Sequence, residues 1–353
     1  MKNYLNIIFT MVLFAGALYL TSCKDDEVSP SVAHVSPESA AAKSLLTVTG
    51  AGLKDIQKIT FENGSVPASF TSTFNTDGAI LFRVPTDAVP GQQNIIFENA
   101  SGKIFTVPFT VLGLATINDV SDYNFKKDTE IILTGKNLDD VTKVTFTGTT
   151  TELEVVNKSA TTLTVKFPQP DPGFYESTLT ITNAAGPATT TQSFVAIDNA
   201  VQLFTDDYGI NPSGNAFQNA SWGPSSISTT QFKSGTASLS LGYAKGNWSQ
   251  DGFGWDNISN DGYKYLSFWL KGASKDYTLY VWSSAQPGTF NTFDDFKKIT
   301  VPANVWTYYK LQVSSLKIFG ENNTTSWNQI GWRIQGPDDQ DETFYIDDVI
   351  LIK

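Results

Sequence analysis

The sequence predicts an all-β chain in which two small sandwiches precede one larger sandwich. Short runs that alternate β-branched and polar residues, bounded by Gly, Pro and Asn, follow one another along most of the chain. One pattern of segments occurs twice, with a period of about 84 residues. The last 153 residues differ in composition, because they hold 27 aromatic residues, including all eight tryptophans, against 18 in the preceding 200.

The repeat can be followed strand by strand. The segment at 46–53 returns at 132–138, both with a Thr-Gly-x-x-Leu motif, and Lys-Ile-Thr-Phe at 58–61 returns as Lys-Val-Thr-Phe. A Pro-Gly turn precedes an alternating strand in each copy, which is typical of a seven-strand sandwich. These motifs resemble the immunoglobulin-like IPT/TIG family, which implies two such sandwiches in tandem, at 32–112 and 113–197. Their expected role is that of a spacer, and ligand binding on a face of one repeat is the alternative.

The first 22 residues are typical of an export signal. A single early charge, Lys2, precedes an apolar run that is short for a membrane span. The tetrapeptide Leu-Thr-Ser-Cys that ends at Cys23 resembles the lipobox of bacterial lipoproteins, and the Lys-Asp-Asp-Glu that follows resembles the surface-export signal of Bacteroidota. The resemblance implies lipidation of Cys23, an acidic tether at 23–31 and a surface-exposed protein held at the outer membrane. An ordinary signal peptide with an incidental Cys is the alternative.

Composition excludes several classes of function. The formal charge is −11 and the chain has only two arginines, Arg83 and Arg333, so nucleic acid is not an expected partner. The single Cys excludes an internal disulfide framework. The single His, His34, lies near the expected tether, which leaves the aromatic region without the residue needed for a Ser-His-Asp triad or for His-ligated zinc.

The aromatic region, 198–353, is predicted to be a jelly-roll sandwich. Strand-like runs are expected at 201–205, 237–243, 263–272, 277–283, 296–301, 306–313, 330–335 and 343–352. Segments such as Leu-Ser-Phe-Trp-Leu-Lys-Gly at 266–272 resemble jelly-roll carbohydrate-binding modules. The whole arrangement resembles the surface glycan-binding proteins of Bacteroidota polysaccharide-utilisation systems, which implies a polysaccharide ligand and a glycan importer as partner.

Several rings of this region lie among Gly, Asn, Asp and Gln, a setting that suits sugars. A sugar has an apolar C–H face that stacks on an aromatic ring and hydroxyls that bond to amides and acids. Strand alternation places Tyr280 and Trp282 on the face opposite the core, and 246–257 is expected to be a loop. The predicted ligand-binding residues are Trp248, Trp255, Asp256, Tyr280, Trp282, Trp332, Arg333 and Gln335. Alternation equally favours a core position for Trp332, and a salt bridge to the acids at 338–341 is the alternative for Arg333.

A group of acidic residues lies on the first and last predicted strands of the jelly roll. The family resemblance implies a structural Ca²⁺ there, and no other cofactor is expected. Solvated edge acids and strand-end caps give the same sequence pattern, so this alternative stays open. The residues are Asp206, Asp207, Asp347 and Asp348.

The sequence as a whole predicts a non-catalytic lipoprotein that binds a neutral glucan, such as a β-glucan. A glycan-degrading enzyme is disfavoured because glycoside hydrolysis usually needs two neighbouring carboxylates. The Glu-x-Asp-x-x-Glu triad of jelly-roll glucanases is missing, and Glu321 and Glu342 are the only glutamates after residue 200. The other alternative is a protein-binding adhesin, although an interface richer in Met and Leu would be expected in that case.

Overall fold

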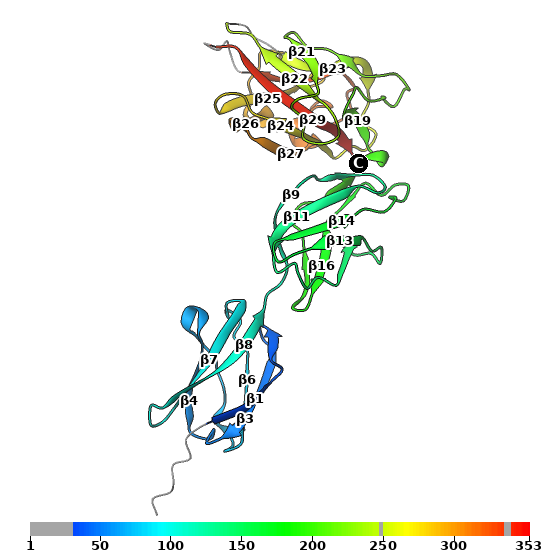
Figure 1. The fold of residues 1–353 in the computed structure, drawn as a ribbon. Coiled ribbons are helices and arrows are strands. Elements are labelled where there is room, and N and C mark those ends of the chain that lie inside the picture. Colours follow the sequence, from blue (N-terminus) through cyan, green and yellow to red (C-terminus); the bar gives the residue numbers. More distant parts are fainter. Residues whose placement is uncertain (1–30, 247–249, 335–339) are drawn as a thin grey trace, which may run out of the picture. The chain divides into compact units, whose positions relative to one another are not determined.

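The computed structural model describes residues 31–246, 250–334 and 340–353, which fold almost entirely as β-strands (Figure 1). The all-β prediction is confirmed. The chain forms two compact units: the first ends at Leu114 and takes in Ala184–Gly186, and the second holds Ala115–Asn183 and Pro187–Lys353. None of the helices in the described ranges is long and apolar enough to cross a membrane. The predicted export signal, Cys23 and the tether up to residue 30 lie outside these ranges.

The first unit contains a sandwich of two sheets around one core. Leu46, Val48, Phe61 and Phe97 are fully buried between the sheets, which is the hydrophobic face that alternation in these strands creates. The chain passes from one sheet to the other between β1 and β2. One sheet has the order β1 (Ser31–Ser36), β3 (Leu45–Ala51) and β6 (Ala79–Arg83), and the other has β2 (Ser39–Ala41), β8 (Ile104–Leu112), β7 (Gly91–Asn99), β4 (Ile56–Phe61) and β5 (Val66–Pro67); the short 3₁₀ turns are η1 (Asn63–Ser65) and η2 (Ser72–Phe74).

The second repeat has equivalent strands in equivalent pairs. Strands β11 and β14 pair as β3 and β6 do, and β12 and β16 pair as β4 and β7 do. The repeated sequence segments therefore form the same strands twice. The sheets are β13 (Glu154–Lys158), β14 (Thr162–Lys166), β11 (Glu130–Lys136) and β9 (Thr116–Val120); β12 (Lys143–Phe146), β16 (Leu179–Asn183) and β17 (Gly186–Thr189); and β10 (Asn124–Phe125), β18 (Phe194–Ala196) and β15 (Glu176–Ser177).

The C-terminal sandwich has two antiparallel sheets, joined to the second repeat by η3 (Ile197–Asn199). We call them the platform sheet and the junction sheet. The platform sheet has the order β20 (Gln218–Asn219), β23 (Gln250–Ile258), β28 (Trp327–Ile334), β25 (Tyr277–Ser283) and β26 (Lys298–Val301), with η4 (Asp295–Lys297) before its last strand. The junction sheet has β21 (Ser225–Ser228), β22 (Ser238–Tyr243), β29 (Glu342–Ile352), β24 (Tyr265–Lys271) and β27 (Trp306–Gln312), with β19 (Val201–Phe204) also on β29 and the short helix α2 (Val313–Leu316) after β27.

Strand alternation predicted the core of this sandwich correctly. Leu266, Phe268 and Leu270 face the core from β24, and Leu279 and Val281 face it from β25. Each of the eight predicted runs coincides with a strand to within a few residues. The prediction of a loop at 246–257 was wrong for its second half, because β23 begins at Gln250. Its glycines suggested a loop, but they lie within a paired strand.

The second repeat is docked on the outer face of the junction sheet. The ring of Tyr123 stacks on Tyr308 and Trp269, with centroids 4.6 and 5.9 Å away. Trp269 Nε1 donates a hydrogen bond to Asp122 Oδ1 at 3.1 Å, and Asn124 Nδ2 donates one to Asp348 Oδ2 at 3.1 Å. Val195 of the second repeat packs against Ile350 and Ile352 of β29 in a small apolar cluster. An ion pair between Lys310 and Glu176 also joins the two domains. The second repeat therefore does more than separate its neighbours, since it holds the C-terminal sandwich through specific contacts.

Replacing Tyr123 with alanine should destabilise this junction. The variant loses two ring contacts of about 1 kcal/mol each and leaves a cavity, so we expect the free energy of unfolding of the second unit to fall by about 2–3 kcal/mol. Urea denaturation of the chain measures the change. Phe232→Ala, which removes an exposed ring from the C-terminal sandwich of the same unit, is the matched control. Equal losses in the two variants would contradict the docking described here.

Candidate functional site

The middle of the platform sheet has a strip without side chains on its outer face, formed by Gly252 and Gly331. Cross-strand pairing places Gln250, Arg333 and Tyr280 in one row across three strands, and Gly252, Gly331 and Trp282 in the next row. A Cβ added at Gly252 would lie 2.2 Å from the carbonyl oxygen of Ile330, and one at Gly331 would lie 2.5 Å from that of Asp251. Both positions therefore require glycine, and both glycines are buried beside the partly exposed Trp282.

Three rings bridge this strip. Phe290 packs against Trp222 with centroids 4.9 Å apart and planes at 41°, and against Trp282 with centroids 5.1 Å apart and planes at 81°. Trp222 belongs to the segment after β20, where its backbone N–H donates a hydrogen bond to the carbonyl oxygen of Gln250 at 2.7 Å. Phe290 comes from the connection between β25 and η4. We call Trp222, Phe290 and Trp282 the ring cluster; Trp222 is 65 % exposed and the other two are partly exposed.

Arg333 lies beneath the cluster and is almost entirely buried. Its guanidinium carbon is 3.8 Å from the centroid of Phe290 and 5.0 Å from that of Phe293. Nη1 donates to the carbonyl oxygen of Phe290, and Nη2 donates to Asn291 Oδ1 at 2.7 Å. Burial lowers the pKa of the guanidinium from its usual value. These two hydrogen bonds hold the connection above the sheet, whereas Asp338 and Asp339, the first acids of the alternative salt bridge considered for Arg333, lie outside the described residues.

Two other predicted ligand-binding residues do not reach the surface. Trp332 has no exposed area and packs in the core against Phe268 and Phe253, so the core alternative was right and the ligand assignment is corrected. Tyr280 faces outward as predicted but is 5 % exposed, because Phe293 covers it at a centroid distance of 5.0 Å.

Of the remaining predicted ligand-binding residues, one lies in the ring cluster and two lie on β23. Trp282 belongs to the ring cluster. Trp255 is 54 % exposed and lies where the register between β23 and β28 is interrupted. Its neighbour Asp256 accepts a hydrogen bond from Asn211 Nδ2. Trp248 and Gln335 lie outside the described residues.

Sequence reasoning missed Trp222 and Phe290. Both lie in segments rich in Ser, Gly, Pro and Thr, where no strand periodicity predicts which way a ring points. The available signal was the pair of isolated glycines in β23 and β28, since glycine within a strand often marks a close approach of other atoms.

Comparisons with known proteins give matches among solved structures, whereas no family model and no curated protein matches the chain. The chain is similar to surface glycan-binding proteins of Bacteroidetes. The protein PbSGBP-B from Prevotella bryantii is 16 % identical over 92 % of this chain and 99 % of its own, with a TM-score of 0.45. SGBP-B from a xyloglucan utilisation locus of Bacteroides uniformis is 16 % identical over 92 % and 100 %, with a TM-score of 0.42. The function proposed below rests on the ring cluster, not on these similarities.

The four acidic residues of the predicted calcium site are held mainly by N–H groups. Asp347 Oδ2 accepts from the N–H groups of Lys233 and Ser234, and Asp206 Oδ1 accepts from that of Ala237 at 2.8 Å. Asp207 Oδ1 accepts from the N–H of Tyr208 and Asp348 from Asn124 and Ser234. Across the described ranges, no three acidic, His or Cys side chains converge as metal ligands do. Calcium also binds backbone carbonyl oxygens, so a structural Ca²⁺ at these four residues stays a prediction.

Asp251 is a fully buried carboxyl group on the core-facing side of β23. Burial raises its pKa to about 8, whereas an unfolded Asp titrates near 3.9. The folded state therefore favours the neutral acid. The stability that this group contributes is fully present below about pH 4 and is lost as the pH rises through about 8.

Asp251→Asn should accordingly stabilise the protein in alkaline solution. The neutral isostere removes the cost of a buried charge, and we expect a gain of roughly 5 kcal/mol at pH 9 and little change at pH 4. Urea denaturation at both pH values measures the difference between variant and wild type. Asp295→Asn controls for the loss of one surface charge. A stabilisation by Asp251→Asn that is the same at both pH values would contradict the raised pKa.

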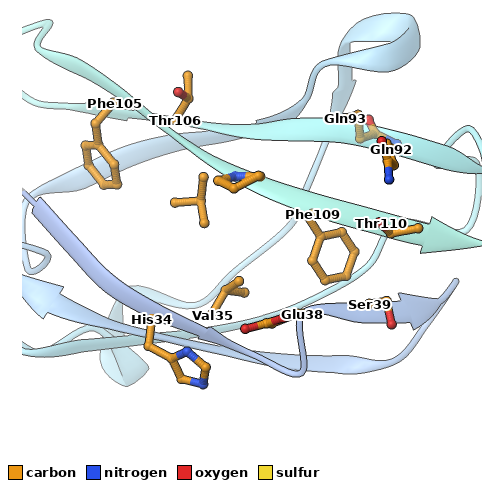
Figure 2. A pocket seen from close by; sticks show the side chains of 12 residues that line it. His34, Val35, Glu38, Ser39, Gln92, Gln93, Phe105, Thr106, Phe109 and Thr110 are labelled. Carbon is orange, nitrogen blue, oxygen red and sulfur yellow. The ribbon is translucent and has the colours of Figure 1, made fainter.

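A separate hollow of about 770 Å³ lies in the first sandwich (Figure 2). Figure 2 shows His34 and Glu38 on one wall and Phe105 and Phe109 of β8 on the other. Phe109 is buried in the core, and Phe105 stacks on Phe97 at 4.9 Å. The hollow therefore offers a sugar little exposed ring surface, and none of the predicted ligand-binding residues lines it.

Proposed function

We propose that this chain is a non-catalytic glycan-binding protein whose ligand stacks on the ring cluster of the C-terminal sandwich. The observation that carries the proposal is the contact of Trp222, Phe290 and Trp282 across the glycine strip of the platform sheet. Three adjoining, partly exposed rings on one sheet face are an uncommon surface for a soluble protein, and such patches mark binding sites.

Amide side chains lie beside these rings and could bind the hydroxyl groups of a sugar. Asn291 is exposed next to Phe290, and the partly exposed Gln329 lies on β28 two residues before Gly331. A pyranose can place its C–H face on a ring while its hydroxyls bond to these amides. Each stack contributes about 1 kcal/mol by analogy with aromatic pairs, so several modest contacts give dissociation constants of roughly micromolar to millimolar size.

The angles between the rings favour a single soluble chain over a crystalline surface. A flat crystal face needs coplanar rings, whereas these planes are inclined by 41° and 81°. A flexible polysaccharide can turn from one ring to the next. The acidic net charge of −11 disfavours an anionic polymer, which leaves a neutral glucan, such as a β-glucan, as the proposed ligand.

The residues around the cluster support the proposal of binding without hydrolysis. The outward positions of β25, β26 and β28, and of β23 from Gln250 to Gly254, carry no carboxylate. Glu342 is buried and accepts hydrogen bonds from Ser274 and Tyr277, and Glu321 pairs with Lys317. These parts of the sheet do not supply the two carboxylates that glycoside hydrolysis usually needs.

The proposed setting is the cell surface. Lipidation at Cys23 would hold the chain at the outer membrane, where a bound polysaccharide would be kept near surface hydrolases and a glycan importer. This part of the proposal rests on the lipobox-like sequence alone.

Native affinity electrophoresis of residues 24–353 in gels containing neutral or anionic soluble polysaccharides tests the proposal. We expect retardation by one class of neutral glucan, no pull-down by microcrystalline cellulose, and no release of reducing ends on long incubation. Release of reducing ends would establish an enzyme. Failure of every polysaccharide to retard the chain would favour a protein-binding adhesin instead.

A further inference from the structure

We propose that Arg333 is a positioning residue that fixes Phe290 as the middle ring of the cluster, so that glycan affinity depends on a buried cation that does not touch the glycan. The inference rests on the proposed function for its effect on affinity, but its structural part can be tested without any ligand.

The connection from Ser284 to Asp294 is held independently at its two ends. On one side, Gln286 is buried and its Nε2 donates to the carbonyl oxygens of Val281 at 3.2 Å and Leu316 at 2.7 Å. On the other side, Thr292 Oγ1 accepts from the N–H of Thr289 at 2.8 Å, and Lys297 Nζ donates to the carbonyl of Thr292. Phe290 and Asn291 lie between these anchors.

Arg333 holds the middle of the connection. Nη1 and Nη2 donate to the backbone of Phe290 and to the side chain of Asn291, while the guanidinium plane lies against the ring of Phe290. The guanidinium group of Arg333 thus fixes both the backbone of Phe290 above the sheet and the position of its ring. Lysine cannot reproduce this, since it offers a point charge without a planar fork.

The position of Phe290 matters because its ring contacts both tryptophans of the cluster. Gly252 and Gly331 have no side chains, and Trp222 and Trp282 stand on either side of them. If Phe290 were free to move, the glycan would have to order the connection on binding, and the entropy cost would reduce affinity.

A double-mutant cycle with Phe290→Ala and Arg333→Lys tests the positioning role. We expect each single variant to bind the glucan about tenfold more weakly than wild type, as removal of one stacked ring does. If Arg333 acts through Phe290, the double variant should bind no more weakly than Phe290→Ala alone. A further tenfold loss in the double variant would show an independent role and overturn the proposal. Arg83→Lys is the matched control, because Arg83 donates to the carbonyl of Lys43 in the first sandwich.

Hydrogen–deuterium exchange of the ligand-free proteins gives a second readout that does not depend on glycan. We expect Arg333→Lys to accelerate exchange in 288–292 while β25 and β28 keep wild-type protection. Faster exchange throughout both strands would indicate a general loss of packing, and unchanged exchange in 288–292 would show that Arg333 does not hold the connection. Either result overturns the proposal. If the wild type binds no glycan, the proposed function fails and this exchange result still decides the structural role.

Discussion

Replacing Trp222 and Trp282 together with alanine is expected to weaken glycan binding by at least about 100-fold. Each truncation at the centre of an interface costs about 2 kcal/mol, and 1.4 kcal/mol corresponds to a factor of ten in the dissociation constant. Trp222 is mostly exposed and Trp282 is partly exposed, so the fold should survive. Isothermal titration with the glucan that retards the wild type measures the loss.

Trp255→Ala is the matched control for this pair. It removes an exposed tryptophan from the same sheet at the interrupted register of β23. We expect it to keep the wild-type dissociation constant within about twofold, since surface changes away from special features have small effects. If Trp255→Ala abolishes binding and the double variant does not, the site lies along the end of β23, around the predicted residues Trp255 and Asp256.

Trp332→Ala should produce the largest loss of stability, about 3–5 kcal/mol. The indole is fully buried between the sheets and contacts Phe268 at 5.0 Å and Phe253 at 6.0 Å, so its removal leaves a large cavity in the core. A loss of this size is a large fraction of the stability of a typical domain. Urea denaturation followed by circular dichroism measures it.

Trp332→Phe separates the core role from a ligand role. Phenylalanine keeps much of the packing, so we expect the variant to fold and to bind glycan with wild-type affinity. A Trp332→Phe variant with normal stability and a tenfold weaker affinity would show that the indole reaches the ligand after all, which would contradict its core position.

The sequence predicted the sandwiches because their strands are half-buried and alternate cleanly. Leu266, Phe268 and Leu270 follow that pattern, and the same count placed Trp332 on the core side and Trp282 on the other. Alternation could not show what covers an outward ring. Trp269 is buried by Tyr123, which lies 146 residues earlier in the chain, and no local signal links the two.

The sequence prediction named one of the three rings of the candidate site. Aromatic rings near amides indicated sugar binding, and Trp282 was among the chosen residues. The other two rings come from irregular segments whose direction is set by tertiary contacts, as the bonds from Arg333 to the Phe290 connection illustrate. Glycines in β23 suggested a loop, although Gly252 lies within a paired strand and forms part of the glycine strip beneath the rings.

Hydrogen–deuterium exchange of the chain with and without a saturating soluble glucan locates the glycan-binding surface. We expect the glucan to slow exchange in two segments, 219–224 around Trp222 and 286–293 around Phe290, and to leave the first sandwich unchanged. Protection confined to the hollow between β1 and β8, or to the end of β23, would contradict this expectation and move the glycan site to that surface.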